Sequence, residues 1–164
     1  MGMLAADHPI TPSPDQPSRP LPAPTARVVR AEVTESPISV TELADAVQDA
    51  AAGAVVTFEG VVRNHDAERA VTGIGYSCHP TAGQVVKQIA QDVAQQGRVR
   101  ALGVVHRVGD LSVGEAALAV AVSSDHRAEA FAVCSQIVEE VKERLPVWKR
   151  QTFTDGSSQW SNIA

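Results

Sequence analysis

One proline, Pro146, sets the tightest constraint on how this chain can fold, because a helical pattern precedes it and a strand pattern follows it. Proline lacks the backbone N–H that a helix needs and its ring clashes with the preceding turn, so a helix that reaches Leu145 must end there. The residues from Val147 to Thr154 favour a strand, and Asp155-Gly156 is typical of a turn. The sequence therefore predicts a sharp helix-to-strand corner.

Two lysines flank this corner. Lys142 falls in the last turn of the predicted helix and Lys149 in the strand, so the corner can bring both amines to one pocket. Two ammonium groups in one pocket repel each other, which favours a neutral amine that can act as a base or a nucleophile. The alternative is structural, since cations at a helix C-terminus complement the helix dipole and stay in solvent. The corner residues alone do not choose between these interpretations.

Composition narrows the class of protein. A chain of 164 residues suits one domain with a sizeable core. The net charge of −5 argues against a nucleic-acid-binding surface, and no apolar run approaches the ~18 residues of a membrane span. The start, Met1 to His8, does not resemble a secretory signal, and Cys78 and Cys134 fall in unlike contexts rather than in a disulfide framework. We therefore expect a cytoplasmic protein with no membrane and no nucleic-acid partner.

The chain divides into a tail and a domain. Residues 1–26 contain most of the ten prolines and too little apolar surface to offset their ordering entropy, so we predict that they are disordered. Residues 27–164 alternate between strand and helix patterns, which predicts one α+β domain. Strands are expected at Arg27–Val33, Ala54–Val62, Ala70–Tyr76, Val99–Val108 and Ala116–Ser123, the last two joined by a glycine-rich turn, and again after Pro146.

Three helices are expected between these strands. Ser39 and Glu42 are spaced as a capping box for the first, which Gly53 should close, and Thr81 should cap the second. The last helix opens near Ser124, and apolar residues recur along it at intervals of three and four, which predicts a core-facing stripe. Its members are Phe131, Cys134, Val138, Val141 and Leu145. Cys134 should therefore be buried and unreactive, with Lys142 at the margin of the stripe.

The remaining polar residues indicate an anion-binding site. The histidines lack metal-ligand spacing, and no nucleotide-binding glycine loop is present, so we expect no metal and no cofactor. Cys78-His79 could form a thiolate–imidazole pair, although adjacent residues rarely adopt that geometry. Arg63 and the His126-Arg127 pair are cationic groups suited to phosphate or carboxylate. With the lysine corner, they predict an anionic substrate and lysine chemistry, without naming the reaction.

These same clusters resemble the large catalytic subunit of molybdopterin synthase. The matching segments follow the order and spacing of that family from about residue 28 onward, and they are Gly53–His65, His106–Gly109, Ser124–Arg127 and Leu145–Arg150. The resemblance implies an α/β hammerhead fold with an antiparallel sheet and packed helices. It also implies a homodimer that binds two small ubiquitin-like sulfur-carrier subunits in a heterotetramer. The chain departs from the family pattern at Gly75–Pro80, where many members carry an acidic residue beside the tyrosine and a further aromatic.

The resemblance also implies a reaction and a set of site residues. The activity is that of a sulfurtransferase, which moves sulfur from the thiocarboxylated C-terminus of the carrier to cyclic pyranopterin monophosphate and so builds the dithiolene of molybdopterin. Lys142 and Lys149 match the catalytic pair of the family. The substrate-binding residues would be Phe58, Arg63, His126, Arg127 and Arg150, with His126 and Arg127 reaching across the dimer. The alternative is a non-enzymatic subunit that docks the carrier tail without chemistry.

Overall fold

The computed structural model describes residues 25–163 and contains three helices and nine strands among them. The helices are α1 (Val40–Ala46), α2 (Ala82–Gln95) and α3 (Arg127–Arg144). The strands are β1 (Arg27–Thr34), β2 (Ala54–Val61), β3 (His65–Asp66), β4 (Arg69–Cys78), β5 (Ala101–Arg107), β6 (Gly109–Ser112), β7 (Ala116–Ser124), β8 (Val147–Phe153) and β9 (Ser158–Asn162). The tail predicted to be disordered lies outside the described residues except for Thr25 and Ala26, of which Ala26 is buried. No helix in residues 25–163 is both long and apolar enough to cross a membrane.

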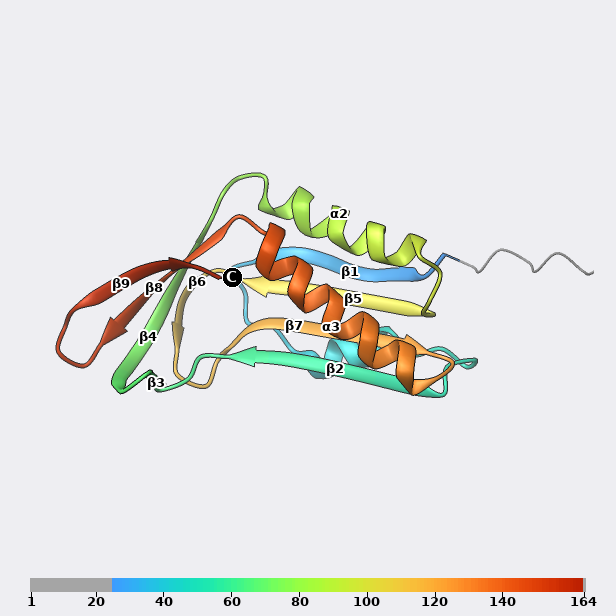
Figure 1. Cartoon of the computed structure of the whole chain (residues 1–164), viewed down its shortest axis with the longest axis horizontal. Helices are drawn as coiled ribbons and strands as arrows, with labels where there is room; N and C mark the ends of the chain where they lie inside the picture. Colours follow the sequence, from blue (N-terminus) through green and yellow to red (C-terminus); the bar gives the residue numbers. More distant parts are fainter. Residues whose placement is uncertain (1–24, 164) are drawn as a thin grey trace, which may run out of the picture.

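A four-stranded sheet forms the centre of the molecule, in the order β1-β5-β7-β2 (Figure 1). Successive side chains of a strand point to opposite faces, so each face of β5 and β7 has its own apolar set. Leu102, Val104 and Val120 pack into one core with α2 and α3, while Ala101 and Val105 pack against α1 on the other face. β5 and β7 are therefore apolar almost throughout, as expected for strands that are covered on both sides.

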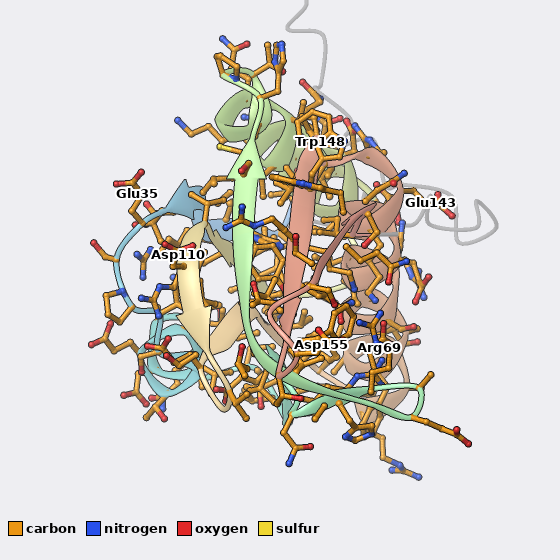
Figure 2. The ribbon with its side chains drawn as sticks, turned by 90° about the vertical axis from the view of Figure 1, so that its left-hand side faces the viewer. Glu35, Arg69, Asp110, Glu143, Trp148 and Asp155 are labelled. Atoms are coloured by element: carbon orange, nitrogen blue, oxygen red, sulfur yellow. The ribbon has the colours of Figure 1, made fainter. Side chains whose placement is uncertain are left out.

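A second sheet lies at one end of the molecule, at the left in Figure 1. Its strands are ordered β3-β4-β8-β9, and β6 pairs with β4 on the side away from β8. Figure 2 views this sheet face-on, with Asp110 on β6 and Trp148 on β8 to either side of β4. All of these pairings are antiparallel. The predicted α+β class, with antiparallel strands and packed helices, is confirmed.

The first helix begins as predicted but ends earlier. The Ser39 hydroxyl accepts a hydrogen bond from the backbone N–H of Glu42 at 3.2 Å, and α1 then stops at Ala46, well before Gly53. Gly53 has a different role, because a Cβ at this position would lie 2.6 Å from the carbonyl oxygen of Asp125. The glycine therefore permits a close approach between the start of β2 and the start of α3.

Two further local predictions were wrong. Thr81 occupies the N-cap position of α2 without capping it, because its hydroxyl is hydrogen-bonded to Nδ1 of His79 at 2.8 Å. The segment between β5 and β7 is more than a turn, since Gly109–Ser112 forms strand β6 against β4. In both cases another part of the chain overrides the local pattern: His79 of the preceding loop binds the Thr81 hydroxyl, and β4 pairs with Gly109–Ser112.

The predicted core stripe of α3 is correct except at its first member. Cys134, Val138, Val141 and Leu145 are buried, whereas Phe131 is 63% exposed. Phe131 lies beside β2, which is the edge strand of the central sheet. The sheet ends there, and no further element within residues 25–163 covers this flank of α3.

Candidate active site

The predicted helix-to-strand corner is present at Pro146. The Leu145 N–H still donates to the Val141 carbonyl at 3.0 Å, after which the chain turns directly into β8. Leu145 and Val147 are both buried, so each side of the corner is anchored in the core. The Pro146 carbonyl accepts a hydrogen bond from the N–H of His79 at 3.0 Å, which ties the end of β4 to the same place. The corner is therefore held by packing and by hydrogen bonding.

A cavity of about 350 Å³ adjoins this corner and lies between the central sheet, the end of α3 and the second sheet. Lys142 from α3 and Lys149 from β8 both line it, together with Phe58 of β2 and Arg63 just after β2. The chain has three lysines, and the third, Lys87, is exposed on α2 outside the cavity. A volume of this size suits a small organic ligand.

The alternation of β8 decides which of its side chains face the cavity. Lys149 and Gln151 line it, and Tyr76, which lies opposite Lys149 in the register with β4, lines it as well. Arg150 belongs to the other face, where its guanidinium carbon lies 5.7 Å from the ring centre of Trp160. The structure therefore does not bring Arg150 together with the two lysines.

The charged groups of the cavity are cationic and poorly compensated. Neither Lys142 nor Lys149 takes part in a salt bridge with any residue in the described range 25–163. Arg63 makes an exposed ion pair with Asp66 at 3.3 Å, which solvent screens. Such a cavity favours an anionic ligand, because uncompensated cations gain the most from a negative partner.

Four further polar residues line the cavity and were not predicted as site residues: His65, Tyr76, His106 and Gln151. His106 is 3% exposed, and burial lowers its pKa to about 4, so the imidazole is neutral at neutral pH. Its Nδ1 lies 2.8 Å from the carbonyl oxygen of Arg107, and its ring meets Tyr76 edge-on with 5.3 Å between ring centres. A histidine in an apolar strand is usually a core residue, so its place in the matching segment His106–Gly109 was the one sequence signal for a functional role.

His126 and Arg127 lie at the opposite end of α3 from the lysine corner. A rise of ~1.5 Å per residue separates Arg127 from Lys142 by about 22 Å, so one chain does not bring them together. His126 lines another cavity of about 280 Å³, beside an ion pair in which Arg100 Nη2 lies 2.9 Å from Asp125 Oδ2. Hydrogen bonding to Arg100 lowers the pKa of Asp125, which keeps this carboxylate charged.

Neither cysteine lines the lysine cavity. Cys134 is buried, as predicted, and burial raises the pKa of its thiol to about 11. Cys78 is exposed at the end of β4, while Nδ1 of the neighbouring His79 is engaged with Thr81. The Cys78-His79 hypothesis therefore gains no support from the geometry. Residues 25–163 contain no cluster of three or more His, Cys, Asp or Glu side chains that could hold a metal ion.

Comparison with known proteins finds one family, in the family models and in individual relatives alike. The family model described as MoaE protein matches residues 33–144. The molybdopterin synthase catalytic subunit of Nostoc sp. is 37% identical over 133 residues, which cover 80% of this chain and 81% of that protein. The protein of the same name from Thermoplasma volcanium is 33% identical over 130 residues, covering 79% of this chain and 95% of that protein.

Solved structures show the same relationship. The crystal structure of molybdopterin synthase from Staphylococcus aureus matches with a TM-score of 0.74 and 28% identity, covering 80% of this chain and 96% of that chain. A complex of subunits 1 and 2 of molybdopterin-converting factor from Helicobacter pylori matches with a TM-score of 0.60. Its identity is 18%, with 84% of this chain and 90% of that chain covered, so this second likeness concerns the fold alone.

Proposed function

Because the chain belongs to the MoaE family of molybdopterin synthase catalytic subunits, we propose that its lysine cavity is where sulfur is transferred to the pterin precursor. The protein is a sulfur-transferring enzyme of molybdenum cofactor biosynthesis. In the proposed reaction, the thiocarboxylated C-terminus of a small ubiquitin-like carrier donates sulfur to cyclic pyranopterin monophosphate. Two rounds build the dithiolene of molybdopterin.

The observation that supports this site most strongly is the convergence of Lys142, Lys149 and Arg63 on one cavity. A thiocarboxylate and a phosphate monoester are both anions, and cations in a partly dry cavity stabilise such groups far more than cations in water do.

The lysines have a direct chemical use in this reaction. The thiocarboxylate sulfur first forms a bond to a side-chain carbon of the pterin, in place of an oxygen substituent. Water then adds to the acyl carbon, and the resulting tetrahedral centre, which bears an oxyanion, collapses with breakage of the acyl carbon–sulfur bond. Sulfur stays on the pterin and the carrier is left with a carboxylate. An ammonium group can stabilise that oxyanion or supply a proton, and a neutral amine can attack the thiocarboxyl carbon. Phe58 contributes an apolar wall, which lowers the local polarity and so strengthens the electrostatic interactions of these groups.

The proposed assembly is a homodimer that binds two carriers in a heterotetramer. The H. pylori structure of this fold contains two different subunits, which supports a small-subunit partner. Exposed Phe131 beside a groove of about 330 Å³ between α3 and β2 supports a second copy at that face. If two α3 helices pack there antiparallel, Arg127 of the partner subunit approaches the lysine corner that Arg127 of the same chain cannot reach.

A reconstitution experiment tests this proposal against the non-enzymatic alternative. The purified protein is mixed with thiocarboxylated carrier and cyclic pyranopterin monophosphate, and molybdopterin is measured by mass spectrometry. A carrier with an ordinary carboxylate serves as the control. We expect product with the thiocarboxylate alone. Carrier binding without any product would instead identify a docking subunit.

A further inference from the structure

The cavity contains a polar atom with no assigned use, Nε2 of His106. The other ring nitrogen, Nδ1, faces a backbone carbonyl, which can only accept, so Nδ1 carries the hydrogen. In the neutral ring this leaves Nε2 as a hydrogen-bond acceptor. The tautomer is therefore determined by the bond to the Arg107 carbonyl.

Nε2 faces the cavity rather than the sealed core. It makes no hydrogen bond within residues 25–163, since the one bond of this side chain is at Nδ1. It is also absent from the fully buried, unpartnered side-chain atoms of that range, which are Arg107 Nε and Ser123 Oγ. A side chain that is 3% exposed, lines the cavity and retains an unpartnered acceptor must present that acceptor to the cavity.

This acceptor differs in kind from the charged groups around it. Arg63, Lys142 and Lys149 only donate hydrogen bonds when charged, and they attract anions. An unprotonated imidazole nitrogen repels an anion and requires an N–H or O–H donor. The cavity therefore combines cationic donors with at least one neutral acceptor, and a ligand that satisfies both must carry anionic groups and donor groups.

A pterin phosphate meets this requirement, because the ring carries N–H groups along its pyrimidine edge and the phosphate is anionic. We propose that His106 positions the pterin substrate by accepting, at Nε2, a hydrogen bond from a ring N–H group. This inference rests on the proposed function, which places the pterin in this cavity. His106 acts here as a positioning residue, while the lysines carry out the chemistry.

Two contacts hold the imidazole ready for this role. The Nδ1 bond to Arg107 fixes the tautomer, and the edge contact with Tyr76, at an interplanar angle of 74°, fixes the plane of the ring. Burial lowers the pKa of the imidazole and keeps the ring uncharged at neutral pH. The acceptor is therefore available before the ligand arrives, and little ordering cost remains on binding.

Binding calorimetry with cyclic pyranopterin monophosphate tests the proposal through two substitutions. His106→Asn retains an amide near the Nδ1 position and loses the cavity acceptor, and we expect about tenfold weaker binding of the pterin. His106→Gln can place an amide oxygen near the Nε2 position, so we expect affinity within about threefold of wild type. His79→Asn, an exposed histidine outside the cavity, is the matched control and should bind like wild type.

The outcomes separate this inference from the proposed function. Unchanged pterin affinity in His106→Asn, or an equal loss in His106→Gln and His106→Asn, would overturn the role of Nε2. A wild-type protein that does not bind the pterin at all would overturn the proposed function and this inference with it. Affinity for the carrier should stay within about twofold in every variant, since the acceptor serves the pterin.

Nitrogen NMR of the wild-type protein is an independent test, because it does not depend on whether a His106 variant folds. An unprotonated imidazole nitrogen resonates well downfield of a protonated one, and accepting a hydrogen bond moves it upfield. We expect the Nε2 signal of His106 to start downfield and to move upfield when the pterin is added. A signal that stays in place once calorimetry shows saturation would overturn the proposal.

Discussion

Lys149 lies directly opposite Tyr76 in the register of β8 and β4, and both side chains line the cavity that also contains Lys142. Burial raises the pKa of Tyr76, so its phenol stays neutral and does not supply Lys149 with an anionic partner. The amine of Lys149 is therefore left for the substrate. This relationship follows from a two-residue period in β8, which directs Lys149 inward and Arg150 outward.

The buried histidine makes stability depend on pH. The pKa of His106 is 6.5 when unfolded and about 4 when folded, so the unfolded chain takes up its proton at higher pH. Stability is thus complete above about pH 6.5 and falls as the pH drops toward 4. Urea unfolding measures the free energy of unfolding at each pH. Between about pH 7 and 4.5 this free energy should fall by about 2 kcal/mol more in the wild-type protein than in His106→Asn. Parallel pH profiles for the two proteins would contradict the burial of a neutral imidazole.

The close approach at Gly53 can be tested against a second glycine. Gly53→Ala should destabilise the protein by about 1–3 kcal/mol, because its Cβ would lie 2.6 Å from the Asp125 carbonyl and backbone must move. Gly83→Ala is the control, since nothing lies within 4 Å of a Cβ there and alanine favours helix α2 by about 0.5–1 kcal/mol. Thermal unfolding should shift in opposite directions for the two variants. A shift of equal sign and size would show that the backbone contact has no cost.

The sequence predicted the features that depend on local chemistry. Pro146 ends α3 because a proline cannot continue a helix, and the apolar residues of the core strands β5 and β7 predict those strands directly. The same reasoning indicated that the corner could bring the two lysines to one pocket, and the family resemblance implied their catalytic role. Arg150 was grouped with them through a contiguous motif, although the strand period places adjacent residues on opposite faces.

Features that depend on distant partners were not predictable. Strand β6 exists because β4 offers an edge to Gly109–Ser112, and no four-residue pattern contains that information. Phe131 is exposed because the sheet ends at β2, which the helical period of α3 does not reveal. His106 reaches a cavity because its strand ends where two sheets meet.

The length of α3 leads to a prediction about the proposed dimer. Arg127→Ala and Lys149→Ala proteins should each have little synthase activity as homodimers, because each lacks one component of every shared site. When the two are unfolded and refolded together, about half of the dimers are mixed, and each mixed dimer contains one intact site. Activity should therefore recover to roughly a quarter of wild type. No recovery, with subunit exchange verified by mass spectrometry, would show that the two residues do not serve one site across the dimer.

The most direct test of the account is the rate of molybdopterin formation by single lysine variants. Two of the three lysines of the chain line the cavity, so Lys87→Ala is a control of identical chemistry on exposed α2. We predict that Lys149→Ala abolishes synthesis and that Lys142→Ala reduces it severely, by at least about a hundredfold. Both should keep wild-type folding and carrier affinity, and Lys87→Ala should be fully active. Near-normal turnover by folded Lys149→Ala protein would contradict the assignment of this cavity as the site of sulfur transfer.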